Sequence, residues 1–233
     1  MTFEQEMNLL TSEQELNFLL SRSDEGIVDW QLSREFAEMA LEEFISCGEF
    51  PADSTLWEIP VSIYDADGTI RYYEFRVMNG ENVIAAIVGN AREDLGGPIS
   101  RVFEMTGYSD ELTNLYNAGK LTENEIPRIV DNDYPNYAIA KSVITKSGNV
   151  NYSGIINPQT GDEETDWTKV LTVEEMIERS PEEFSESEIN SANSALKDYK
   201  EEIAELWKMA KVNKGSLSNL TFKGVKEEAE NCC

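Results

Sequence analysis

The chain has 233 residues, 40% of them hydrophobic and 9% aromatic, which is enough for a globular fold with a substantial buried core. Its 45 acidic and 19 basic side chains give a net charge of -26, which argues against binding to nucleic acid or to anionic lipid. Histidine is absent, so no Ser-His-Asp triad, Cys-His dyad or histidine-bearing zinc site can be completed within this chain.

The first 50 residues are predicted to be helical. Ser12 and Glu15 have the spacing of a capping box in front of an apolar run. A second helix is predicted from Asp29 to Gly48, because its apolar residues recur at i, i+3 and i+4. We expect both apolar stripes to cover one face of a sheet.

Residues 56–107 carry the pattern that specifies the architecture. Alternation of apolar and polar residues predicts strands at 56–64 and 69–78, joined by a hairpin turn at Asp67-Gly68. Asn79-Gly80 marks a second turn before an apolar strand at 83–88, and a fourth strand is predicted at 99–105. The sequence therefore predicts a four-stranded antiparallel meander. With a long helix packed across it, this gives an α+β layer, cystatin-like in general shape.

The second half of the chain is predicted to add a hairpin and more helices. A short helix at 109–118 precedes a loop at 131–136 and a hairpin of strands 137–144 and 150–156, which either extends the sheet or forms its own. Further helices begin near Thr172, Ser180 and Ser185, and the last has an apolar stripe that docks on the core or on a partner. We divide the chain into N-terminal helices (1–50), a sheet core with the second hairpin (51–160), C-terminal helices (161–212) and a linker-like tail (213–233).

The sequence shows no export or membrane signal. The N-terminus is acidic and lacks a continuous apolar core, and no stretch reaches the roughly 18 apolar residues of a spanning helix. We therefore expect a cytoplasmic chain without membrane contact. A precursor from which an N-terminal segment had been removed would instead be secreted.

No metal or cofactor site is predicted. Asp65 and Asp67 begin like a calcium-binding loop, but Ile70 stands at the sixth position, where glycine is needed. Asp131 and Asp133 fail in the same way, and we interpret the acidic run at 162–166 as a solvated loop. An enzyme that uses only carboxylates or tyrosine is left open.

One segment of the chain resembles a known family. The run Val83–Ala91 lies between residues that also match, and together they resemble the N-terminal pro-region of Gram-positive papain-like cysteine peptidases of the streptopain-like and bacteriocin-processing-like group. The resemblance covers about a quarter of the chain and implies an inhibitory or folding-assisting pro-region whose partner is a peptidase domain. The matching residues outside that run are Tyr64, Asp65, Asp67, Gly68, Ile70, Tyr73, Phe75, Pro98, Ile99, Phe103 and Gly107.

The cysteines allow several interpretations. Cys232 and Cys233 are two ordinary thiols, or a doubly prenylated terminus, although the phosphate-binding loop of the GTPases that carry one is missing. The resemblance implies a third reading: in those peptidases the pro-region leads into a catalytic domain whose nucleophilic cysteine sits at a helix N-terminus. Cys233 would then be that nucleophile, provided that the chain continues into a peptidase domain with its histidine. Cys47 is interpreted as a buried structural thiol.

Two functional hypotheses of different classes follow. The first is the peptidase pro-region. The second is a free-standing acidic protein-binding module, of the immunity or antitoxin kind, that binds a basic partner. In either case this chain is not expected to be an enzyme by itself.

Overall fold

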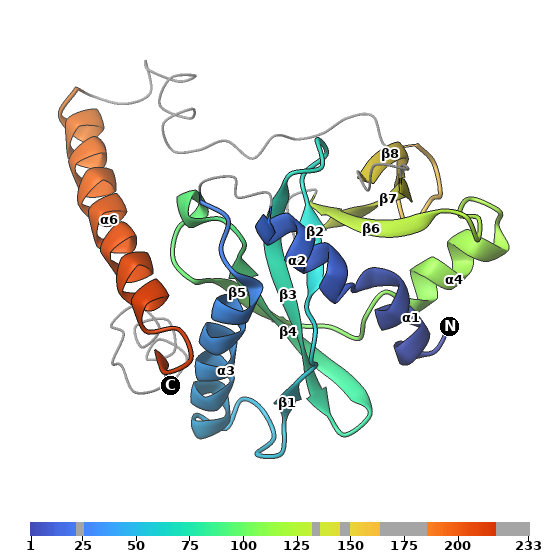
Figure 1. The fold of residues 1–233 in the computed structure, drawn as a ribbon, viewed down its shortest axis with the longest axis horizontal. Helices are drawn as coiled ribbons and strands as arrows, with labels where there is room; N and C mark the ends of the chain where they lie inside the picture. The colour runs from blue at the N-terminus through green and yellow to red at the C-terminus, as the bar shows by residue number, and fades with distance from the viewer. Residues whose placement is uncertain (22–25, 132–135, 145–149, 164–185, 218–233) are drawn as a thin grey trace.

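The computed structural model describes residues 1–21, 26–131, 136–144, 150–163 and 186–217. The fold is α+β, with a mixed eight-stranded sheet of order β5-β4-β3-β2-β6-β7-β8 in which β1 pairs with β3 (Figure 1). The strands are β1 (Thr55–Leu56), β2 (Val61–Tyr64), β3 (Ile70–Asn79), β4 (Asn82–Asn90), β5 (Ile99–Glu104), β6 (Ile126–Asp131), β7 (Tyr137–Ile144) and β8 (Val150–Ile156). The helices are α1 (Phe3–Leu10), α2 (Glu13–Ser21), α3 (Trp30–Ser46), the short η1 (Glu93–Leu95), α4 (Ser109–Asn117) and α6 (Glu186–Val212).

The predicted meander is confirmed as β2–β5, whose neighbouring strands are all antiparallel. Gly68 and Gly80 have positive φ angles, as their two hairpin turns require. The first predicted strand is wrong in one respect, because it is split into β1 and β2. Pro60 lies in the break and has no N–H to donate to a ladder, so the chain between the two short strands leaves the regular pairing.

Strand β6 was not predicted, and it changes the character of the sheet. It pairs in parallel with β2 through Ile63 and Ile129, and antiparallel with β7, so the second hairpin extends the same sheet. The predicted loop at 131–136 is wrong at Asp131, which ends β6, while residues 132–135 lie outside the described residues. The sheet is therefore mixed and larger than the meander alone.

Helices pack against both faces of the sheet, which corrects the expectation that they cover one. Tyr72 and Val88 belong to one hydrophobic cluster with Met7 of α1 and Leu112 of α4. Their strand neighbours Tyr73 and Ile87 belong to a second cluster, which contains Leu16 of α2 and residues of α3. Because successive residues of a strand point to opposite faces, the two clusters lie on opposite sides of the sheet.

The change of face occurs within a very short link, since only Thr11 and Ser12 separate α1 from α2. It is possible because β2 and β6 pair over a short stretch and then diverge, and Figure 1 shows β6 and β7 turned steeply away from β2 and β3. Arg128, near the start of β6, donates to the backbone oxygen of Leu9 at 3.3 Å. The first two helices thus meet the sheet where β6 and β7 diverge from β2 and β3.

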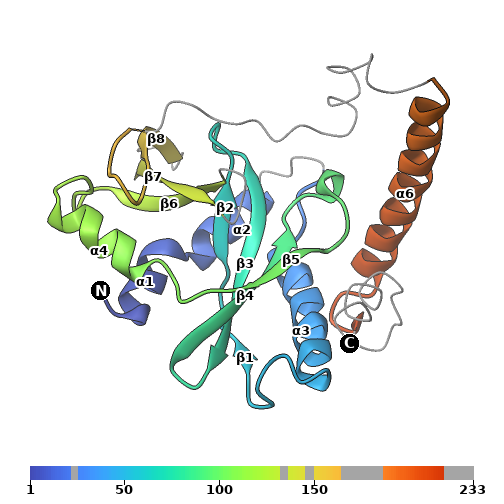
Figure 2. The same cartoon turned by 180° about the vertical axis from the view of Figure 1, so that it is seen from behind.

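Helix α3 is buried along two sides. One side contributes Trp30, Ala37, Ala40 and Leu41 to the sheet cluster. The other side forms a third cluster with Trp207 and other residues of the C-terminal part of α6. Both views show α6 as the outermost helix, close to the rest of the fold only toward its C-terminal end (Figures 1 and 2). The third cluster contains Val28, Leu32, Phe36, Trp207, Ala210 and Leu217.

Residues 213–217, predicted to begin a linker, instead fold back onto α3. Lys214 pairs with Asp29, and Glu35 accepts the backbone N–H groups of Gly215 at 2.7 Å and of Leu217 at 3.4 Å. The rest of the predicted tail lies outside the described residues, as do the helix starts at Thr172, Ser180 and Ser185. None of the helices in the described ranges combines the length and apolar content that crossing a bilayer requires.

Candidate functional site

The predicted site residue, Cys233, and its neighbour Cys232 lie outside the described residues. Cys47 is described, and the expectation of a buried structural thiol is wrong there. It follows α3 as the C-cap residue, is half-buried, and is disulfide-bonded. Its position at the surface end of the helix, beyond the last buried turn, explains why it is accessible to a disulfide partner.

The most unusual arrangement of polar side chains lies inside the protein, between α1, β3 and the start of α4. The Arg76 guanidinium is 3.1 Å from Glu6 Oε1 through Nη2 and 2.9 Å from Glu74 Oε1 through Nε, the latter as an ion pair without the alignment of a hydrogen bond. All three side chains are at most 1% exposed. Tyr108 stacks against the same guanidinium, with its ring centroid 4.7 Å away, and donates its hydroxyl to Glu74 Oε2 at 2.7 Å.

Glu6 also organises the N-terminus of α4. Its carboxylate accepts the backbone N–H of Tyr108 at 2.9 Å and the hydroxyl of Ser109. A helix N-terminus favours negative charge, so this carboxylate lies where an anion is stabilised. Gly107 makes the approach possible: it has a φ of +100°, and an added Cβ would lie 2.8 Å from a Glu6 oxygen. The group formed by the buried Glu6, Glu74, Arg76 and Tyr108 with the half-buried Ser109 is called the Glu-Arg-Glu cluster below.

Burial is the main influence on the pKa values of Glu74 and Tyr108. Loss of solvent raises the pKa of Glu74, and the nearby Glu6 raises it further, against the opposing effects of Arg76 and of the Tyr108 hydrogen bond. Burial also raises the pKa of Tyr108 well above its usual value of 10. The cluster is closed to a substrate in this conformation, and its direct effect is to fix α1 and α4 on the sheet.

A second polar group lies where α2 meets the diverging strands. Arg128 binds the Glu15 carboxylate through both Nε, at 3.0 Å, and Nη2, and Tyr64 donates its hydroxyl to Glu15 Oε1 at 2.5 Å. Burial raises the pKa of Tyr64 well above 10, and the charge of Glu15 adds to the rise. This group anchors α2 as the Glu-Arg-Glu cluster anchors α1.

A third group lies at the ends of the two parallel strands. Arg71 contacts Asp65, directly after β2, at 3.0 Å, and Asp131, at the end of β6, at 2.9 Å. The carboxyl ends of β2 and β6 therefore meet, and the two aspartates share a guanidinium. Among the described residues no three histidine, cysteine or acidic side chains converge as metal ligands would.

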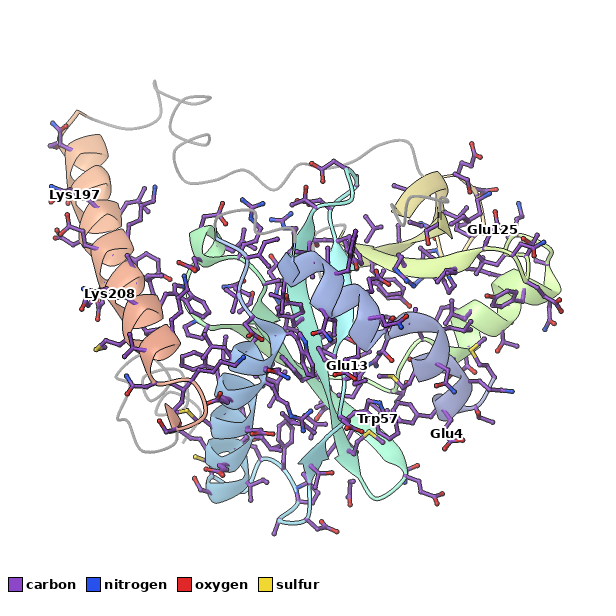
Figure 3. The ribbon with its side chains drawn as sticks, viewed as in Figure 1. Glu4, Glu13, Trp57, Glu125, Lys197 and Lys208 are labelled. Atoms are coloured by element: carbon purple, nitrogen blue, oxygen red, sulfur yellow. The ribbon has the colours of Figure 1, made fainter. Side chains whose placement is uncertain are left out.

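Internal pairing of arginines leaves the outer surface of the sheet core acidic. Five arginines of residues 1–131 bind carboxylates of the same chain. Exposed lysines instead follow α6, where Lys197 and Lys208 are about three-quarters exposed (Figure 3). A partner approaching the core consequently meets mainly negative charge. Exposed carboxylates include those of Glu4, Glu13, Glu42, Glu49 and Glu81.

The apolar stripe of α6 docks on the core in its C-terminal part. Trp207 packs edge-on against Phe36 at 5.8 Å between ring centroids and donates its indole N–H to the backbone oxygen of Gly96 at 2.9 Å. Lys211 forms an ion pair with Glu93. Tyr199, two turns earlier on the same predicted stripe, is 50% exposed, so docking weakens toward the start of the helix.

Sequence reasoning missed all three polar groups. Glu74 and Arg76 carried a usable signal, since two charges at i and i+2 in an apolar strand point to the same buried face and need partners there. The identity of those partners had no local signal, because Glu6 is 70 positions from Arg76.

Fold and polar groups together define an α+β protein in which buried ion pairs join helices to both faces of a mixed sheet. Comparison of the chain with protein-family models, with curated proteins and with solved structures finds no match in any of the three.

Proposed function

We propose that the chain is the pro-region of a papain-like cysteine peptidase and that it binds the peptidase domain as an inhibitor or a folding aid. The observation that carries the proposal is the resemblance of residues 64–107 to such pro-regions. In the structure this segment forms one continuous unit, the strands β3, β4 and β5 with the end of β2.

Several of the resembling residues join the helices to that unit. Tyr73 donates its hydroxyl to the backbone oxygen of Val28, just before α3, at 2.9 Å. Gly89 lies directly under Ser33 of α3, and Gly107 lies against Glu6 of α1. The resemblance therefore includes residues with defined tasks in attaching helices to the sheet, which supports a shared framework.

Cys233 belongs to this proposal as the nucleophile position of a following catalytic domain. The chain has no histidine, so the general base of such a peptidase would have to come from that domain. A pro-region acts by contact with its enzyme, and the proposed partner is accordingly the peptidase domain.

The acidic surface favours a second candidate, a free-standing module that binds a basic protein. The net charge of -26 and the internal pairing of the arginines leave a negative field around the core, which would steer a basic partner toward it. In this case Cys233 has no catalytic meaning.

The first experiment is to read the source reading frame past Cys233. A continuation with Gly-Pro and a later histidine supports the pro-region, and the peptidase domain is then expressed separately and assayed with the present chain added. Inhibition of that enzyme, with no effect on an unrelated papain-like peptidase, is the expected result.

The salt dependence of binding distinguishes the two candidates. Between about 0.1 M and 1 M salt the Debye length falls from about 10 to 3 Å. Binding whose affinity persists over this range indicates apolar packing, and binding whose affinity collapses indicates the acidic binder. A stop codon after Cys233, together with no inhibition of any papain-like peptidase, would overturn the pro-region proposal.

A further inference from the structure

The Glu-Arg-Glu cluster places two carboxylates against the same guanidinium in the interior of the protein. Glu6 reaches Arg76 from α1, and Glu74 reaches it from β3. An ionised carboxylate is costly to bury, and two carboxylates close together disfavour each other's ionisation. A proton on one of them lowers the cost of closing this site.

The surroundings distinguish the two carboxylates. Glu6 accepts the backbone N–H of Tyr108, the hydroxyl of Ser109 and a guanidinium N–H of Arg76, all close to the N-terminus of α4. Three donors and the N-terminus of α4 thus surround the Glu6 carboxylate. Glu74 accepts the hydroxyl of Tyr108 at 2.7 Å and forms an ion pair with Arg76 Nε at 2.9 Å.

We propose that Glu74 is a proton-binding site that makes the seating of α1 and α4 on the sheet depend on pH. When Glu74 is protonated and neutral, the positive charge of Arg76 is compensated by Glu6 alone. The contact that joins α1 to β3 through Arg76 then carries no net charge. Ionised Glu74 adds a negative charge beside Glu6 and weakens that link. The charged and titratable groups that face Glu74 are Glu6 from α1, Arg76 from β3, Tyr108 before α4 and Tyr137 from β7.

The direction of the pH effect follows from linkage. The pKa of Glu74 is raised in the folded protein above its usual value of 4.5, mainly by burial. Its contribution to stability is therefore complete below pH 4.5 and is lost as the pH rises through the folded pKa. While one such proton dissociates, the folding equilibrium constant falls by up to about tenfold per pH unit.

Urea unfolding of the full chain between about pH 5 and pH 8 tests the proposal. Glu74→Gln, which carries no charge at any pH, should remove the one-proton decline relative to the wild type. Glu81→Gln removes the same charge at an exposed position of the β3–β4 turn, and it should keep the wild-type slope. Hydrogen exchange, corrected for the intrinsic rate, should show that α1 and α4 lose protection with rising pH before α3 does.

A second readout does not depend on a variant that folds. Infrared spectra of wild-type protein labelled at glutamate should show the band of a buried protonated carboxyl above pH 4.5, and the band should vanish as the protein is brought to higher pH. Absence of the band throughout, or parallel stability profiles for wild type and Glu74→Gln, would overturn the proposal. The proposal would also be overturned if Glu6→Gln abolished the pH dependence of stability while Glu74→Gln kept it, because Glu6 would then be the group that binds the proton.

Discussion

Replacing Gly89 with alanine should loosen the attachment of α3 to the sheet. Gly89 lies on β4, and a Cβ added there would sit 2.2 Å from the Ser33 hydroxyl oxygen on α3. Real Cβ contacts are never that short, so helix and strand must move apart or Ser33 must change rotamer. The backbone of Gly89 does not have a positive φ, so alanine meets only this steric obstacle.

The expected loss follows from the cost of overpacking a well-filled core, about 1–3 kcal/mol. Ser33 offers a direct check, because its hydroxyl is buried without a hydrogen-bond partner among the described residues. Removing it with Ser33→Ala should be neutral or stabilising by about 1 kcal/mol, since a buried unpaired hydroxyl is unfavourable. The double variant should regain most of the stability, giving a coupling energy of about 1–3 kcal/mol.

The free energy of unfolding of the wild type, the two single variants and the double variant is measured by urea unfolding with tryptophan fluorescence. Trp30 and Trp207 report on the packing of α3, because they are buried on its two sides. With a slope of about 2 kcal/mol/M, Gly89→Ala shifts the midpoint by roughly 0.5–1.5 M. Gly97→Ala is the matched control, because its Cβ would meet Ile203 at an ordinary 3.6 Å. If the double variant is no more stable than Gly89→Ala alone, the contact between Gly89 and Ser33 does not limit the packing of α3.

Three further predictions concern the buried polar groups and α6. Arg76→Met leaves Glu6 and Glu74 buried without the guanidinium and should cost about 3–5 kcal/mol in urea unfolding. Arg92→Met, at an exposed ion pair, should cost no more than about 1 kcal/mol. Trp207→Ala should lower the free energy of unfolding by about 3–5 kcal/mol and should allow limited proteolysis to cut α6 before it cuts the sheet. Cleavage of α6 and the sheet at the same time would contradict the idea that α6 can detach on its own. In an alkaline absorbance titration, Tyr64 and Tyr108 should stay un-ionised near pH 10 and should ionise only as the fold opens, because burial raises their pKa values. The stability that these two tyrosines contribute is lost as the pH rises through their raised pKa values.

Local signals in the sequence were sufficient for the elements with clear ends. The predicted helix from Asp29 to Gly48 corresponds to α3, because Asp29 accepts the backbone N–H of Gln31 at 2.9 Å and Gly48 supplies a positive φ after the last turn. The Ser12 cap is likewise confirmed by the N–H of Glu15, at 3.3 Å. Such signals act within a few residues and can be read without knowing the fold.

Features that depend on distant partners escaped prediction. Pro127 and Arg128 interrupt the apolar pattern of β6, and its pairing with β2 joins segments more than 60 residues apart, so no local rule placed it. The acceptor of the Arg128 side chain, Glu15, is 113 positions away. Strand alternation and helical periodicity predicted the fold class, while the arrangement of the buried ion pairs depends on contacts between distant parts of the chain.

The wide spacing of these contacts has a consequence for synthesis on the ribosome. Glu6 must wait for Tyr108, which follows it by 102 positions, and Glu15 must wait even longer for Arg128. At about 5–20 residues per second, the first two helices emerge roughly 5–20 s before Tyr108 and Arg128. During that interval Glu6 and Glu15 lack these partners, so a nascent chain stalled before β6 is expected to be a target for chaperones. Helices α1 and α2, which are made before the sheet, are therefore among the last of the described elements to reach their final contacts.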